Sequence, residues 1–139
     1  MSEIDHVAAL TERQQGCLPD HLGLEWLEAR PGFVRGRFDV KPHHMAPNRF
    51  LHAASVIALA DSACGYGCII TKPDTATGFT TIELKSNFLG TAREGAVACV
   101  ATLVHGGRTT QVWDAIATDE RTGKTMALFR CTQMLLYAK

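Results

Sequence analysis

Residues 50–71 form a long stretch in which Asp61 is the one acidic or basic side chain, with His52 taken as neutral. Eleven of the sixteen residues from Ala53 to Cys68 are Ala, Gly, Ser or Cys. Such a small surface allows close packing, and an ionised carboxylate buried there is costly unless it has a partner. We therefore predict a buried helix that ends before Pro73, on which Asp61 serves chemistry or, alternatively, caps buried backbone.

The length and composition of the chain fit one ordinary globular domain. Its 139 residues, with 46% apolar and 20% charged side chains, are expected to fold as a single unit over 1–139, with residues 1–18 as a helical extension. The formal net charge is zero, so no long-range field recruits nucleic acid or an anionic membrane. The early acids of the N-terminus do not fit a signal peptide. A central Asp costs about 2.5–3.5 kcal/mol in a membrane, so we expect a buried helix in a soluble protein.

The cysteines predict a reducing compartment. There are five, an odd number, and they include no C-x-x-C pair, which favours free thiols and a cytoplasmic location over a disulfide framework. Cys64 and Cys68 share a helix face, but two soft ligands do not make a zinc site. His43 and His44 lie at an unrelated place, so no metal and no cofactor are expected.

A short N-terminal helix is predicted to end near Gly16. Ser2 and Asp5 have the spacing of a capping box, and apolar residues recur on one helical face. The residues on that face are Ile4, Val7 and Leu10.

The remainder of the chain has the pattern of about six strands. Pro31-Gly32 is a turn between the first two, Gly106-Gly107 fits a hairpin turn that needs positive φ, and successive strands joined by short turns run antiparallel. The expected strands are 22–29, 33–40, 80–89, 96–104, 109–118 and 125–137. The fold class is thus α+β, with one long helix inserted after the second strand. One sheet face covers the helix, and pairing with a second copy would cover apolar residues elsewhere, so we expect a homo-oligomer.

Several segments together resemble the hot-dog fold and, within it, the thioesterases of the phenylacetate pathway (PaaI-like) and the 4-hydroxybenzoyl-CoA thioesterases. The resemblance covers roughly residues 20–137 in the family's order of elements. The matching segments are Leu51-His52-Ala53-Ala54, Leu59-Ala60-Asp61, residues 81–89, Gly95, residues 107–113 and Thr122-Gly123-Lys124. The resemblance implies a long helix wrapped by a curved antiparallel sheet, with two active sites at a dimer interface and often a dimer of dimers.

The resemblance also implies residue roles in the hydrolysis of an acyl-CoA thioester. Asp61 acts as general base or nucleophile, the backbone N–H of Ala53 after His52 holds the thioester oxygen, and Thr81 helps to position water. An unpaired N–H at a helix N-terminus suits a developing oxyanion. Eight helical steps separate Ala53 from Asp61 by about 12 Å, too far to act on one carbonyl, so the family takes the acid from the neighbouring subunit. For Thr81, a plain strand residue is the alternative.

Three positions depart from the family pattern. Ala53-Ala54 replaces the usual Gly-Gly, although Ala retains the backbone N–H. The amide expected six residues before His52 is Ala46, and Asn48 is the nearest substitute. The hydroxyl that several members carry one turn after the acid is replaced by Gly65, next to Cys64, which we interpret as a packing residue.

For the nucleotide end of coenzyme A, the resemblance points to the tract from His105 through Gly106, Gly107, Arg108 and Thr109 to Thr110. Arg108 can pair with phosphate oxygens, and a Gly-rich turn exposes backbone N–H groups; a plain hairpin with a solvated Arg is the alternative.

Two other classes stay open at this stage, a non-catalytic acyl-CoA-binding protein and a hot-dog enoyl-thioester hydratase. The family's hydratases carry a His-Pro-Gly stretch that this sequence lacks. No Gly-x-Ser-x-Gly elbow is present, which disfavours a serine hydrolase. The sequence does not indicate the acyl group.

Overall fold

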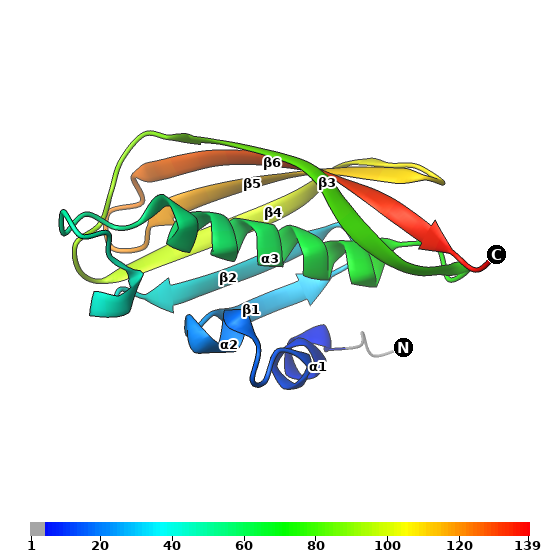
Figure 1. Ribbon diagram of the computed structural model, residues 1–139, viewed down its shortest axis with the longest axis horizontal. Helices are drawn as coiled ribbons and strands as arrows, with labels where there is room; N and C mark the ends of the chain where they lie inside the picture. The colour runs from blue at the N-terminus through cyan, green and yellow to red at the C-terminus, as the bar shows by residue number, and fades with distance from the viewer. Residues whose placement is uncertain (1–4) are drawn as a thin grey trace.

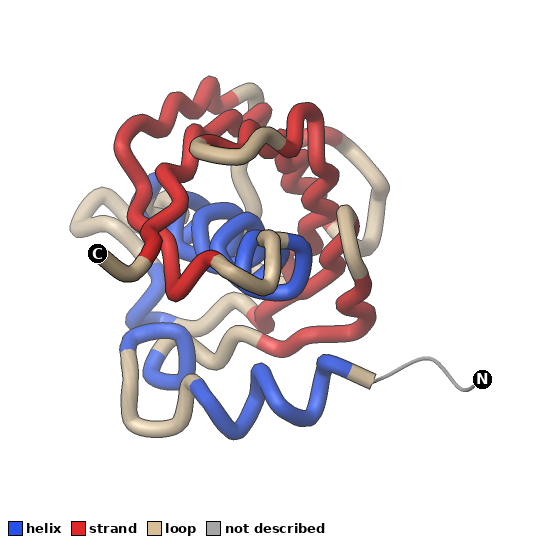
Figure 2. The backbone as a smooth tube through the Cα atoms, turned by 90° about the vertical axis from the view of Figure 1, so that its right-hand side faces the viewer, coloured by secondary structure: helices blue, strands red, loops and turns tan. Residues whose placement is uncertain are grey.

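The computed structural model describes residues 5–139 as one long helix held against a six-stranded antiparallel sheet. In Figure 1 this helix, α3, crosses the inner face of the sheet, and Figure 2 shows the strands curving around it. The predicted hot-dog architecture is confirmed. In chain order the elements are α1 (His6–Arg13), α2 (Leu18–His21), β1 (Glu25–Arg30), β2 (Phe33–Asp39), the 3-10 turn η1 (Pro42–His44), α3 (Ala53–Thr71), β3 (Ala76–Phe88), β4 (Ala96–Gly106), β5 (Thr110–Asp119) and β6 (Thr125–Tyr137).

The N-terminal helix starts at a different cap from the one predicted. The Asp5 side chain accepts a hydrogen bond from the N–H of Val7 at 2.9 Å, while Ser2 and Ile4 lie outside the described residues. The buried Gln14 at the end of α1 joins three elements: its amide donates to the carbonyl of Leu24 at 2.9 Å, and its oxygen accepts from Trp26 at 2.8 Å and Tyr66 at 3.1 Å. The N-terminal extension is therefore fastened to both β1 and α3.

The first strand is shorter than predicted. Residues 18–21 form the short helix α2, and Gly23, at φ +70°, turns the chain before β1 begins at Glu25. The expectation that residues 22–24 belong to the strand was therefore wrong, because the chain is still leaving α2 there.

The strands lie in the order β1-β2-β4-β5-β6-β3. The hairpins β1–β2, β4–β5 and β5–β6 follow from short turns as predicted. β3, by contrast, is not a neighbour of β4, although the two run in opposite directions. It pairs with β6 instead and forms an edge of the sheet, while the segment after it crosses the sheet end. The N–H groups of Leu89 and Gly90, at 2.7 and 3.2 Å from the carbonyl oxygen of Met126, fix that crossing.

The small residues of α3 allow large side chains to lie directly on its backbone. A Cβ atom added to Gly67 would lie 2.4 Å from the ring of Trp113, and one added to Gly65 would lie 3.0 Å from Phe79. α3 is long and apolar enough to cross a membrane by length and composition, but half of that window is buried within the fold. It is the core helix that the sequence predicted.

Candidate active site

The start of α3 presents a free backbone donor. His52 is the N-cap, and its Nδ1 accepts the N–H of Ala54 at 2.9 Å, while its carbonyl accepts that of Ser55 at 2.9 Å. Within residues 5–139, the N–H of Ala53 has no acceptor. Ala53 also lines a cavity of about 280 Å³ together with Phe50, Leu51, Val56, Phe88, Gly90 and Thr91. An N–H that opens into a largely apolar cavity at the positive end of a helix can bind a carbonyl or oxyanion.

His44 holds this helix start in place. Its side chain is 1% exposed, its Nδ1 accepts the N–H of Lys41 at 2.9 Å, and its Nε2 donates to the carbonyl of Leu22 at 2.7 Å. Its own carbonyl accepts from the N–H of His52 at 3.0 Å and from the hydroxyl of Ser55 at 2.8 Å. His44 is thus a neutral imidazole that couples the loop before α3 to α2. Burial, with the neighbouring His43 and Lys41, lowers its pKa below the ordinary value of 6.5.

Replacing His44 by Leu should reduce the free energy of unfolding by about 2–3 kcal/mol, because it leaves the N–H of Lys41 and the carbonyl of Leu22 unpaired. A group with a depressed folded pKa stabilises the fold above its unfolded pKa, and that stability is lost as the pH falls through the folded pKa. The free energy of unfolding, measured with urea, should therefore fall more between about pH 7 and pH 5 for the wild type than for His44→Leu. In the control variant His21→Gln, the free energy of unfolding should depend on pH as it does in the wild type. The same pH dependence of the free energy of unfolding in all three proteins would contradict this role of His44.

Asp61 is a half-buried acid, and one of its carboxylate oxygens is buried without a partner. Its Oδ1 is one of two buried side-chain oxygens in the described part of the chain with no hydrogen bond, the other being the hydroxyl of Ser86 on β3. Burial raises the pKa of Asp61 above its usual value of 3.8. A carboxylate that lacks solvation and partners is a stronger base than a solvated one, so this environment suits proton abstraction.

The inner face of β3 lies beside the helix turn that follows Asp61. Phe79 packs on Gly65, where an added Cβ would lie 3.0 Å from its ring, so the family's hydroxyl side chain would fit there only if Phe79 moved. Two residues further along the same face, the hydroxyl of Thr81 donates to the side-chain oxygen of the fully buried Gln133 at 2.7 Å. Gln133 was not among the sequence candidates, because a Gln in the last strand of a sheet carries no local signal.

Asn48 lies at the exposed tip of the loop before α3. Its side-chain oxygen accepts the N–H of Phe50 at 3.1 Å, which closes a local turn. The next residue, Arg49, has a φ of +69°.

The turn between β4 and β5 lies at the opposite end of α3 from Ala53 within one chain (Figure 1). It is closed by the N–H of Gly107, which donates to the carbonyl of Thr110 at 2.9 Å, and Arg108 is exposed at its tip. Neither Gly106 nor Gly107 has a positive φ, so that expectation was wrong. Space is the reason for Gly107, because a Cβ there would lie 2.9 Å from the ring of His105 and 3.1 Å from the carbonyl of Thr110.

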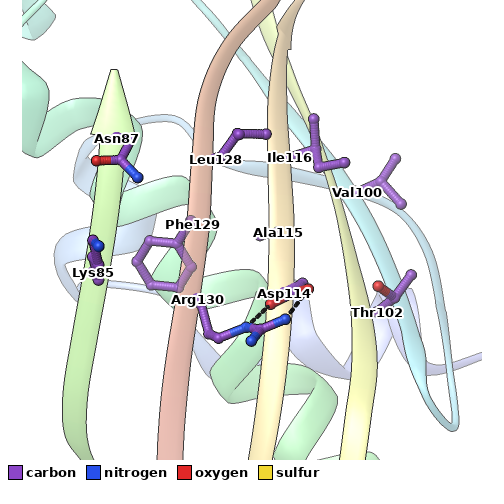
Figure 3. A pocket seen from close by; sticks show the side chains of 10 residues that line it. All are labelled: Lys85, Asn87, Val100, Thr102, Asp114, Ala115, Ile116, Leu128, Phe129 and Arg130. Atoms are coloured by element: carbon purple, nitrogen blue, oxygen red, sulfur yellow. Dashed lines mark hydrogen bonds and ion pairs between the residues drawn. The ribbon is translucent and has the colours of Figure 1, made fainter. Parts of the chain in front are cut away.

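The outer face of the sheet carries a groove of about 480 Å³ on the side away from α3, here called the outer groove. Figure 3 shows Val100, Ile116 and Leu128 as an apolar row beside Arg130, whose guanidinium binds both oxygens of Asp114 at 2.5 and 2.8 Å. This pairing lowers the pKa of Asp114. The one acid that lines the groove, Asp114, is paired with Arg130, so its chemistry does not match that around Asp61.

No cluster of three or more His, Cys, Asp or Glu suitable for a metal ion occurs among residues 5–139. All five cysteines are free. Cys64, Cys68, Cys99 and Cys131 are buried, and burial raises the pKa of Cys99 to about 12 and that of Cys68 to about 11. These thiols are packing residues, as we interpreted Cys64 to be.

The long helix and the curved six-stranded antiparallel sheet define a hot-dog protein. The family model of the thioesterase superfamily matches residues 48–131. The 1,4-dihydroxy-2-naphthoyl-CoA hydrolase of Listeria monocytogenes is 29% identical over 116 residues, which cover 83% of this chain and 92% of that enzyme. A variant of thioesterase PA1618 from Pseudomonas aeruginosa has a TM-score of 0.91 at 24% identity, covering 98% of this chain and 97% of that one. PaaI of Escherichia coli has a TM-score of 0.83 at 21% identity, covering 96% and 94%.

The match to the family model spans more than half of the chain. The protein therefore belongs to the thioesterase superfamily and is a thioester hydrolase with a PaaI-like hot-dog fold.

Proposed function

We propose that the protein hydrolyses an acyl-CoA thioester to a free acid and coenzyme A. The observation that carries the proposal is Asp61, a half-buried carboxylate with a raised pKa and one buried, unpaired oxygen, on the same helix as the free N–H of Ala53. The relatives named above as a CoA-ester hydrolase and a thioesterase support this substrate class.

In the proposed reaction the thioester oxygen accepts the N–H of Ala53. Asp61 takes a proton from water, whose oxygen attacks the thioester carbon, and Thr81 helps to hold that water. The C–S bond then breaks, and the departing thiolate takes the proton held by Asp61, which gives free coenzyme A and restores the Asp61 carboxylate. The hydrogen bond from the Ala53 N–H stabilises the transition state more than the bound substrate, because negative charge develops on the oxygen and the N–H is already aligned at the helix terminus. Nucleophilic attack by Asp61 itself, with later hydrolysis of an anhydride, uses the same residues.

The site requires two subunits. Ala53 and Asp61 are eight residues apart on one straight helix, or about 12 Å, so the acid that serves one Ala53 comes from the partner. β3 is the surface that supports this dimer, because it is an edge strand with one pairing neighbour and its exposed side chains include Ile82 at 52% and Phe88 at 43%. An exposed apolar edge favours pairing with an identical edge.

A dimer of dimers would use a different surface. The outer groove and the exposed Val100, Ile116 and Leu128 supply an apolar area on the face of the sheet that α3 does not cover. The free thiols support a reducing, cytoplasmic location for the assembly.

Product analysis tests the proposed reaction. Incubation with acyl-CoA should yield free acid and free thiol in equal amounts. A hydroxyacyl-CoA formed from an enoyl-CoA would identify a hydratase instead, and stoichiometric binding without product would identify an acyl-CoA-binding protein.

Arg108→Ala should raise KM for acyl-CoA about fivefold to tenfold with little change in kcat, because a phosphate contact supplies binding that is equal in ground and transition states. The rise should be smaller for an acyl-pantetheine, which has no nucleotide phosphate. Equal rises for both substrates would show that Arg108 acts through the fold, and no rise for either would leave it a solvated turn residue.

A further inference from the structure

A second cavity, here called the basic cavity, is lined by the loop that leads into α3 and by Arg93. It has a volume of about 550 Å³, and its walls include Lys41, Arg49 and Arg93 but no Asp or Glu. The carboxylate of Asp39, close in sequence, is already bound by Arg37 at 2.8 Å. Lys41, Arg49 and Arg93 form no ion pair within the described residues. The cavity therefore carries three positive charges that the fold does not neutralise.

Arg49 occupies a backbone position that normally favours glycine. Its φ of +69° is the one positive value at a non-Gly residue in the part of the chain that the structure describes. Its N–H donates to the carbonyl of Ala46 at 2.9 Å, and that of Ala46 donates to the carbonyl of Phe50 at 2.7 Å, so the turn holds this conformation. Backbone strain of this kind is concentrated at binding sites, and here it places a guanidinium in the wall of the basic cavity.

Arg93 connects the basic cavity to the candidate active site. Its guanidinium carbon lies 4.7 Å from the centre of the Phe50 ring, and Phe50 lines the cavity that opens at Ala53. A thioester bound at Ala53 therefore lies across one aromatic side chain from Arg93, which lines the basic cavity together with Lys41 and Arg49. The Arg108 turn, in contrast, lies at the far end of α3 in the same chain.

We propose that the basic cavity binds a phosphate group on the thiol half of the substrate. This inference rests on the proposed thioesterase function and adds Lys41, Arg49 and Arg93 to it as substrate-binding residues. Arginine and lysine recognise phosphate through charge-assisted hydrogen bonds, and a cavity without acids discriminates in favour of an anion. Two kinds of thioester carry such a phosphate next to the pantetheine arm: coenzyme A, and a carrier protein whose pantetheine is joined through a phosphodiester.

Arg49→Gly is the decisive variant, because binding and folding should respond in opposite directions. Glycine relaxes at φ +69°, so the melting temperature should stay equal or rise. KM for the phosphate-bearing thioester should nevertheless rise about tenfold, and about as much again in Arg49→Gly combined with Arg93→Gln. Arg35→Ala removes the same charge from an exposed site on β2, outside the basic cavity, and should leave KM unchanged.

Each variant is assayed with one acyl group on coenzyme A, on pantetheine and on a carrier protein. A rise with coenzyme A alone, or with the carrier protein alone, supports the phosphate site and identifies its source, while the pantetheine ester stays unaffected. No rise with either phosphate-bearing substrate, or an equal rise with the pantetheine ester, overturns the proposal. Failure of the wild type to cleave any of the three overturns the proposed function instead.

Discussion

Asp61→Asn should lower kcat by about 100-fold or more, the usual scale for losing a general base, while the protein stays folded. The amide keeps the shape of the side chain but cannot accept a proton from water. Wild-type kcat/KM should also fall as the pH drops toward the raised pKa of Asp61, because protonation removes the base. The measurement is initial-rate thiol release at several pH values.

The stability of Asp61→Asn separates this role from a structural one. The folded pKa of Asp61 is raised, so ionisation of this half-buried carboxylate costs stability as the pH rises past its unfolded pKa. The Asn variant should therefore melt at an equal or higher temperature near neutral pH. A variant with near wild-type turnover, or one that loses activity only because it unfolds, would show that Asp61 is structural.

Ala53→Pro should lower kcat about 10²- to 10³-fold, which is the loss found when one oxyanion donor is removed. Ala53 is the first residue of α3, a position where proline is well tolerated because its N–H has no helical partner. The preceding His52 has φ −66° and ψ 132°, which is the backbone that a following proline requires. The substitution therefore removes the N–H with little change to the helix.

A matched control is available one position further along. The N–H of Ala54 is already bound to His52, so Ala54→Ser keeps that bond and should retain most of the activity. If Ala53→Pro hydrolyses acyl-CoA at the wild-type rate while remaining folded, the N–H of Ala53 does not bind the thioester oxygen.

The sequence predicted where the helices and strands lie better than it predicted which strands pair with each other. The small-residue pattern gave α3 almost to the residue, and period-2 alternation with short turns gave three hairpins. The place of β3 could not be predicted, because its partners on β6 are some 50 residues away and no local pattern encodes that pairing; Thr81, for example, lies opposite Gln133. The position of β3 at an edge of the sheet is therefore a finding of the structure.

Within the candidate site, the residues found from sequence were those with a local anomaly. Asp61 is conspicuous as the lone charge in an apolar helix, and His52 marks the helix start. His44 was set aside as an unrelated nitrogen, because its hydrogen bonds to α3 and α2 join it to residues 11 and 22 positions away in the sequence. Arg49 gave no signal either, because a positive φ at a non-Gly residue is imposed by the folded loop.

A mixture of the two inactive variants tests most directly whether each active site is built from two subunits. Co-expressed Asp61→Asn and Ala53→Pro chains form hybrid dimers in which one site has both defects and the other has none. If the chains mix randomly, half of the dimers are hybrids with one working site, so the preparation should recover about a quarter of wild-type thiol release. Recovery at that level is the result we predict. A mixture as inactive as its parents, or a fully active wild-type monomer in light scattering, would contradict a site built from two subunits.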